Sequence, residues 1–483
     1  MTAADLYTIV AGCIVNPLAL DHLDIQPRAA VVFSQQTGCI VAMETFTGPT
    51  NGAEDNPEFA RGLGRLVNAY GGPDHTTVIR LSGTQFLLPG FIDTHTHASQ
   101  FANMGTGYDM PLLQWLDRYT FPEEAKFADS DYAGRVYDAA VAQFVQCGTT
   151  TAVYFGTIHT NSCCRLVDIV RRRGQRAWVG KVNMDRNAPE YYIETTERSV
   201  QETERFIDYV SEVSRDAAVT SPPLLTAVIT PRFVGSCSSA LMRALSKLAQ
   251  RHQLPVQSHL CENQAEVAWT LAMHPECTTY AGIYQEHGLL ATQTILAHCV
   301  HPSPGELALL ANHQVGIAHC PNSNFMLQSG VANVRQMLRH NLAVGLGTDV
   351  SGGSSPSLLD AMRQALVASR TLAGLQATKP SPAESQDDCR SPAAAPPLGL
   401  AEVVYLATMG GAQALGWARH LGNFAVGKAF DALICSTVPN ASLVEDCMKP
   451  STWQTRLEQF VYLADDRHID RVYVQGNCIH QRS

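Results

Sequence analysis

Two histidines with one residue between them, His95 and His97, end the apolar segment LLPGFIDTHTH. On a β-strand, residues at i and i+2 point to the same face, so both imidazoles can approach one bound ion. The pair alone is a weak signal, because two of 17 histidines fall at this spacing by chance fairly often. A single histidine at a strand end is also more often structural than functional. A metal site therefore needs further polar residues at matching positions.

Three further polar residues end later apolar runs of the chain. His259 ends a run in VQSHL, His298 in TILAH and Asp349 in AVGLGTD. The imidazoles of His95, His97 and His259, together with the carboxylate of Asp349, suit Zn²⁺ or Fe²⁺ and leave space for a water. Because all of these residues stand at predicted strand ends, chance placement is improbable. The pattern predicts a metal site.

The chain between these residues alternates apolar runs with amphipathic stretches. Eight runs are predicted to be strands: LLPGFIDTHTH, TTTAVYF, RAWVGKVNM, LLTAVITPR, PVQSHL, TILAHC, QVGIAHC and AVGLGTD. Helical spacing of apolar residues marks the stretches 131–148, 238–252 and 332–341. Eight β-then-α units predict an α/β fold, a closed parallel (β/α)₈ barrel over residues 88–421. Active sites lie at the carboxyl ends of the strands of such a barrel, where these polar residues stand.

Both ends of the chain contain short β-rich runs instead. We expect residues 1–87 and 422–483 to form one small composite β-sandwich domain. Within it, the residues 46–76 are rich in Gly, Asn, Asp and Pro, and we expect them to form a loop-bearing excursion from the sheet. The residues 377–398 are rich in Pro, Ala and Ser, which predicts a flexible surface insertion in the barrel.

Composition disfavours several classes of protein. The chain has 483 residues, of which 45% are hydrophobic and 16% charged, and this is typical of a large folded core rather than of disorder. A net charge of −10 without a basic patch disfavours nucleic acid and anionic membranes as partners. The 14 cysteines include no C-x-x-C pair, and no signal peptide or membrane-spanning run is evident. We therefore expect a cytoplasmic protein with reduced thiols.

The histidines and aspartate at the strand ends resemble those of the amidohydrolase superfamily, metal-dependent hydrolases with a (β/α)₈ barrel and a composite β-domain. Several flanking segments resemble the guanine deaminase family in particular, and together they span about residues 89–475. These segments are PGFIDTHTHASQ, YDMPLLQWLDRYTFP, TTTAVYFGTIHT, GQRAWVGKVNMD, PEYYIETTE, ITPRF, QSHLCEN, AHCPNSN, LGTDVSGG and YLADDRHIDRVYVQG. The resemblance implies hydrolytic deamination of guanine to xanthine and ammonia, by a homodimer.

The resemblance also implies catalytic roles for three residues. Glu262 is expected to take a proton from the attacking water, protonate a ring nitrogen and help the amine to leave. Its alternative is a solvated glutamate at a helix start. His298 is expected to orient the attacking water, or else to be a core histidine. Asp349 is expected to be both a metal ligand and a second proton acceptor, or else a helix cap.

One metal ion per chain is expected. In relatives with two ions, a carbamylated lysine or a glutamate at the end of the fourth strand bridges them, and Arg232 stands there instead. Lys181 lies on the third predicted strand, and we expect it to be buried or to support the site from behind the ligands.

The resemblance further implies a substrate-binding set of Gln100, Trp115, Arg232, Phe233, His259 and Glu262. Arg232 carries five N–H donors and suits a purine carbonyl, while Gln100 offers a donor and an acceptor to a purine edge. Phe233 and Trp115 are expected to stack on the base, although aromatic residues beside apolar ones, as in PLLQWL, are more often core. If Arg232 needs the 6-carbonyl of guanine, adenine leaves a buried charge unsatisfied.

Two other functions remain open. The same machinery can deaminate or dechlorinate another purine, a pterin or a triazine ring. A non-catalytic assembly protein on this barrel is the other alternative, and it predicts eroded metal ligands, whereas all are intact here. The zinc cytidine-deaminase fold is disfavoured, because its P-C-x-x-C motif is absent.

Overall fold

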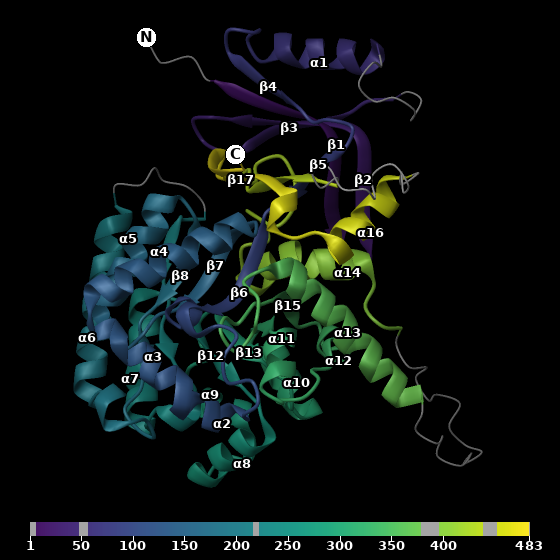
Figure 1. Cartoon of the computed structure of the whole chain (residues 1–483). Helices are drawn as coiled ribbons and strands as arrows, with labels where there is room; N and C mark the ends of the chain where they lie inside the picture. The colour runs from purple at the N-terminus through teal and green to yellow at the C-terminus, as the bar shows by residue number, and fades with distance from the viewer. Residues whose placement is uncertain (1–5, 48–56, 216–221, 378–395, 438–451, 483) are drawn as a thin grey trace.

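The computed structural model describes residues 6–47, 57–215, 222–377, 396–437 and 452–482. A large sheet formed by both ends of the chain lies beside a longer stretch of alternating strands and helices (Figure 1). No helix in these residues is long and apolar enough to cross a membrane. The insertion predicted at 377–398 falls almost entirely on 378–395, which lie outside the described residues.

The large sheet consists of β1 (Tyr7–Ala19), β2 (His22–Ser34), β3 (Ile40–Thr45), β4 (Thr76–Arg80), β5 (Gln85–Pro89), β16 (Ala432–Ser436), β17 (Ile469–Val474) and β18 (Asn477–Gln481). The strand order is β18-β17-β16-β5-β1-β2-β3, and β4 also pairs with β1. Strand β5 pairs in parallel with β1 and antiparallel with β16, and so joins the two ends of the chain. The division of the chain into domains at residues 87 and 422 stays a prediction.

The segment 46–76, expected to be a loop-bearing excursion from the sheet, contains helix α1 (Pro57–Ala69), which the sequence analysis did not predict. The apolar residues Phe59, Leu63 and Leu66 recur at three- and four-residue spacing and pack against sheet residues such as Ile9. Glycine and asparagine lower helix propensity, and their abundance in the segment hid this amphipathic pattern.

Every predicted strand of the middle of the chain contains at least one observed strand. They are β6 (Phe91–His97), β7 (Thr149–Phe155), β8 (Arg176–Gly180), β9 (Val182–Asn183), β10 (Leu225–Ala227), β11 (Thr230–Pro231), β12 (Val256–Leu260), β13 (Thr294–His298), β14 (Gly316–His319) and β15 (Ala343–Leu346). All pairings among them are parallel, in the orders β10-β8-β7-β6, β11-β9 and β12-β13-β14-β15. The third and fourth predicted strands are each broken in two.

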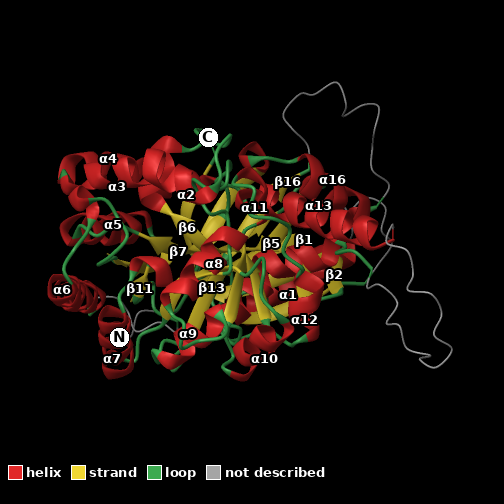
Figure 2. Cartoon of the chain, turned by 90° about the horizontal axis from the view of Figure 1, so that it is seen from below, coloured by secondary structure: helices red, strands yellow, loops and turns green. Residues whose placement is uncertain are grey.

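Figure 2 shows the strands in the middle of the molecule and helices around them. The helices of this part are α2 (Leu112–Trp115), α3 (Phe121–Ala125), α4 (Ser130–Gln146), α5 (Thr160–Arg173), α6 (Thr196–Ser214), α7 (Ser239–His252), α8 (Gln264–Met273), α9 (Tyr280–Glu286), α10 (Pro304–Asn312), α11 (Pro321–Met326), α12 (Val334–Arg339), α13 (Leu358–Ala377), α14 (Leu400–Tyr405) and α15 (Gly411–Ala414), with α16 (Trp453–Leu463) near the C-terminus. Side chains cap several helix starts: Asp129 caps α4, Ser238 caps α7, and Ser303 caps α10.

The first and last strands of this series meet at their carboxyl ends. The backbone N–H of Asp349 donates to the His95 oxygen at 2.9 Å, and that of His97 donates to the Val350 oxygen at 2.9 Å. The buried Asp93 carboxylate accepts from the backbone N–H of Thr348 at 3.0 Å. These bonds bring the predicted metal ligands of β6 and of the segment after β15 to one place.

A buried ion pair joins the large sheet to the α/β part. Arg176 in β8 is fully buried, and its Nε and Nη2 donate to Asp431 Oδ2 and Oδ1 at 3.2 and 3.3 Å. Its Nη1 donates to the Pro222 oxygen at 2.6 Å, while Asp431 also accepts from the Gln475 backbone N–H at 2.7 Å. Removing one partner leaves the other charge buried without compensation.

We therefore predict that Asp431→Asn lowers the free energy of unfolding by about 3–5 kcal/mol, because the Arg176 guanidinium keeps its charge in the core. Asp138→Asn is the matched control, since Asp138 pairs with Arg172 and Arg173 at the surface and should contribute only about 0–1 kcal/mol. Urea titration followed by circular dichroism measures both. Equal losses in the two variants would contradict the role of the buried pair.

Candidate active site

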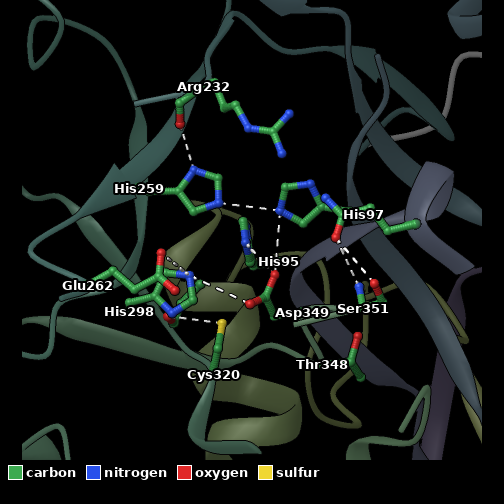
Figure 3. A network of polar contacts seen from close by, with 12 residues as sticks. His95, His97, Arg232, His259, Glu262, His298, Cys320, Thr348, Asp349 and Ser351 are labelled. Carbon is green, nitrogen blue, oxygen red and sulfur yellow. Dashed lines mark hydrogen bonds and ion pairs between the residues drawn. The ribbon is translucent and has the colours of Figure 1, made fainter. Parts of the chain in front are cut away.

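The structure brings the four predicted metal ligands together (Figure 3). His95 and His97 lie at the end of β6, His259 lies in β12, and Asp349 follows β15. His97 Nε2 is 3.3 Å from His259 Nε2, and Asp349 Oδ1 is 3.1 Å from His95 Nε2 and 3.4 Å from His97 Nε2. All four side chains are buried.

The electrostatics of this cluster favour the metal-binding protonation states. Burial lowers the pKa of His97 and of His259 well below the usual range, so both imidazoles are neutral. Burial alone would raise the pKa of Asp349, but the neighbouring His95, His298 and His97 together outweigh it and the pKa is lowered, so this group is a carboxylate. Neutral imidazoles and carboxylates are the forms that bind metals.

The donor set fits a divalent cation. The nearest ligand nitrogens of His95, His97 and His259 lie within 4.8 Å of one another. Cys320 Sγ also lies within 4.8 Å of ring nitrogens of His95 and His298, and burial raises the pKa of this thiol well above its usual range. Three imidazole nitrogens and one carboxylate oxygen match the ligands that Zn²⁺ and Fe²⁺ take in proteins.

Backbone groups hold the ligands from behind. His259 Nδ1 lies 2.6 Å from the Arg232 carbonyl oxygen, which can only accept, so the proton sits on Nδ1 and the Nε2 lone pair faces the cluster. Asp349 has a φ of 47°, in the left-handed region that costs a non-glycine residue energy. Gly347 permits the close approach of β6, because a Cβ there would lie 3.0 Å from the Cβ of His95.

Glu262 and His298 stand beside the ligands. Glu262 lies between β12 and α8, and its Oε2 is 3.6 Å from His298 Nε2. His298 Nε2 is also 3.7 Å from Asp349 Oδ2, and its Nδ1 is 2.9 Å from Asn324 Oδ1. Burial raises the pKa of Glu262 to about 7. A carboxyl group with this pKa can both accept and donate a proton near neutral pH.

A pocket opens onto this cluster. Its polar lining includes Gln100, Arg232, Glu262, His298 and Asp349. Phe233 and Trp115 also line it, and the remaining apolar lining consists of Leu112, Leu113, Leu116 and Leu327. Every predicted site residue except His95 lines this pocket, and His95 lies behind it in contact with Asp349.

Arg232 lines the pocket, and its charge is compensated by an ion pair with Glu124. Its Nη1 donates to Glu124 Oε2 at 2.6 Å and its Nη2 donates to Glu124 Oε1 at 3.1 Å. Gln100 Nε2 donates to the same carboxylate at 2.8 Å. The expectation that adenine leaves the charge of Arg232 unsatisfied is therefore wrong, because Glu124 already compensates that charge.

Sequence reasoning missed several residues of the site. Glu124 sits beside Glu123 in FPEEAK, and nothing in the sequence separates the two. Glu266 lines the pocket in the first turn of α8, four residues after Glu262, and its short separation from Glu262 in the chain was a usable signal. Lys181 is buried against Ser199, at 3.4 Å, and does not line the pocket.

Comparison with known proteins places the chain in a family. Residues 86–479 match the model of the amidohydrolase family. Guanine deaminase of Dictyostelium discoideum is 37% identical over 480 residues, which cover 99% of this chain and 99% of that protein. Guanine deaminase of Homo sapiens is 42% identical over 405 residues, covering 83% of this chain and 84% of that protein.

Solved structures agree with this placement. The crystal structure of guanine deaminase from C. acetobutylicum with bound guanine in the active site has a TM-score of 0.81 and 33% identity, covering 98% of this chain and 100% of that one. A triazine hydrolase with a TM-score of 0.75 and 17% identity shares the fold alone. The extent of the family match and the identity to these relatives show that the chain belongs to the amidohydrolase family and, within it, to the guanine deaminases.

Proposed function

We propose that this chain removes the 2-amino group of guanine by hydrolysis, giving xanthine and ammonia. The observation that carries the proposal is a single pocket in which the buried His97, His259 and Asp349 face Glu262, with Arg232 in the same lining. Membership of the guanine deaminases supports this substrate.

The metal site is the first part of the mechanism. We assign one divalent cation, Zn²⁺ in preference to Fe²⁺, to His95, His97, His259 and Asp349. A cation held there would lower the pKa of a water, so that this water could act as a nucleophile near neutral pH. The neutral state of His97 and His259, which burial maintains by lowering the pKa of each, keeps their lone pairs available for it.

Glu262 handles the protons. Its raised pKa of about 7 allows Oε2 to accept a proton from the attacking water and then donate it to a ring nitrogen, which makes the neighbouring carbon more electrophilic. The same carboxyl group helps to protonate the departing amine. His298, 3.6 Å from Glu262 and 3.7 Å from Asp349, orients the attacking water, while Asp349 is the second proton acceptor.

The base is held at the other side of the pocket. Arg232 and Gln100 donate to the polar edge of the purine, and Phe233 and Trp115 pack against its faces, while His259 and Glu262 border the reacting carbon. Because Glu124 compensates the charge of Arg232, selection depends on N–H donors that a wrong base leaves without acceptors.

Several finer features of the protein belong to the same proposal. We infer a closed (β/α)₈ barrel beside a composite β-sandwich domain, supported by the hydrogen bonds from Asp349 to His95 and from His97 to Val350 that tie the last strand to the first. A homodimer is our inference from the family resemblance, and a cytoplasmic location is our inference from the 14 cysteines without a C-x-x-C pair.

We predict that the purified protein holds about one Zn²⁺ or Fe²⁺ per chain. His259→Gln should lose most of this metal, because it removes one of four ligands. His252→Gln, at the exposed end of α7, is the matched control and should keep it. Elemental analysis by mass spectrometry measures the content. Two ions per chain, or full activity without metal, would reject the ligand assignment.

We predict that Glu262→Gln retains the metal and the melting temperature but reduces kcat by roughly 10²–10⁴, because proton transfer is lost while the shape of the side chain is kept. Glu286→Gln, on the exposed surface of α9, should behave as the parent. Ammonia release gives the rates. A Glu262→Gln enzyme within a few-fold of the parent would show that another group moves the proton.

We predict that guanine is turned over at a kcat/KM roughly 10²–10⁴ above that of adenine, cytosine or guanosine, since adenine and cytosine leave buried donors unpaired. Guanosine has the same base and fails for a different reason, because a pocket closed around the base has no space for ribose. Spectrophotometric and ammonia-release assays over these compounds, 8-oxoguanine, pterins and aminotriazines decide the matter. Inert guanine with an active pterin or triazine would overturn the proposed substrate.

A further inference from the structure

Glu124 is a fully buried carboxylate that lies beside the pocket but does not line it. It belongs to α3, which follows the segment that carries the pocket residues Leu112 and Trp115. Its Oε1 accepts from Arg232 Nη2 at 3.1 Å and from Gln100 Nε2 at 2.8 Å. Its Oε2 accepts from Arg232 Nη1 at 2.6 Å and from Tyr192 Oη at 2.6 Å. Each oxygen thus has two donors, and both pocket residues among those donors belong to the proposed purine-binding set.

The contacts of Arg232 fix its guanidinium plane as well as its charge. The two parallel N–H···O bonds to Glu124 form a bidentate pair, which sets the orientation of the fork. The ring of Phe121, three residues before Glu124 on α3, lies 5.2 Å from the guanidinium carbon. The pair with Glu124 occupies two of the five N–H groups of an arginine, so the side chain keeps donors for a ligand.

The same carboxylate orients the Gln100 amide. A carboxylate accepts only, so the amide nitrogen must face Glu124. The Gln100 Oε1 then accepts from the Ser351 backbone N–H at 3.2 Å, in the segment that follows the metal ligand Asp349. Without Glu124, the nitrogen and oxygen of the amide could exchange places, and the edge that Gln100 offers to a purine would change.

We propose that Glu124 is a positioning residue for purine recognition, which sets the Arg232 fork and the Gln100 amide together so that their remaining N–H groups read a neutral 6-oxopurine. The inference rests on the proposed deamination of guanine. A buried ion pair is weak evidence for stability, because an apolar pair of similar volume often serves as well. Because Glu124 contacts the two pocket side chains Arg232 and Gln100, its role under this proposal is to set the specificity for the base.

The test compares Glu124→Gln with Glu123→Gln on guanine and on 2-aminopurine, which has the reacting amine but no 6-carbonyl. Glu123 is the neighbouring residue of the same helix, and it binds Lys126 at 2.6 Å and Tyr132, away from Arg232. For Glu124→Gln we expect KM for guanine to rise by about tenfold or more with kcat changed much less, as for loss of a binding contact. The ratio of kcat/KM between guanine and 2-aminopurine should fall by a similar factor, while Glu123→Gln keeps the parent ratio.

A second variant and a binding measurement cover the case in which Glu124→Gln folds poorly. Glu124→Asp keeps the negative charge but moves it away from Arg232, so its guanine preference should lie between those of the parent and Glu124→Gln. Calorimetry with hypoxanthine and with unsubstituted purine should show the same loss of preference for the 6-carbonyl in the folded fraction.

The possible outcomes distinguish a failure of the proposed guanine deamination from a failure of the proposed positioning role of Glu124. A parent protein that does not deaminate guanine overturns the proposed function and this inference with it. If the parent deaminates guanine and Glu124→Gln lowers the activity on guanine and on 2-aminopurine equally, because less protein is folded, Glu124 is structural only. An unchanged guanine to 2-aminopurine ratio in folded Glu124→Gln or Glu124→Asp likewise overturns the positioning role.

Discussion

The hydrogen bonds between β6 and the segment after β15 are the constraint on which the site depends. His95 and Asp349 are 254 positions apart in the printed sequence, yet the Asp349 N–H donates to the His95 oxygen at 2.9 Å. These bonds place the Asp349 carboxylate 3.1 Å from the His95 imidazole, with a backbone φ of 47° that would be costly elsewhere. The parallel strands between them then present His259 and His298 at the same edge. The predicted metal site therefore depends on the hydrogen bonds that hold the segment after β15 against the end of β6.

Burial of this site creates the protonation states that the chemistry needs. The low dielectric lowers the pKa of His97 and His259 and raises that of Glu262 to about 7. The same desolvation makes every unpaired charge costly. The Asp349 carboxylate accordingly contacts the His95 and His97 imidazoles, and Arg232 forms an ion pair with the Glu124 carboxylate. One physical effect therefore explains both the raised pKa of Glu262 and the pairing of Arg232 with Glu124.

The sequence predicted the parts of the fold that depend on local pattern. Apolar runs that end in a polar residue identified β6, β12, β13 and β15, because a buried strand and its functional end are contiguous in the chain. It missed α1, whose amphipathic pattern lies in a glycine-rich segment, and it did not predict the breaks between β8 and β9 and between β10 and β11. The ion pair between Glu124 and Arg232 could not be predicted from the sequence, because 108 positions separate the partners and the adjacent Glu123 is also a glutamate.

The compensated arginine changes how discrimination among purines must arise. An unpaired buried guanidinium would reject any base without a suitable acceptor by a large electrostatic cost, whereas a paired guanidinium rejects it only through N–H groups left without partners. Each such group costs about 1–3 kcal/mol, so two or three of them are needed to reach the selectivity expected of a deaminase for one base. In the proposed function Arg232 and Gln100 supply these donors from two different elements, and both donate to Glu124. Selectivity under that proposal depends on the alignment of several hydrogen bonds, and alignment is the property that a shared carboxylate can enforce.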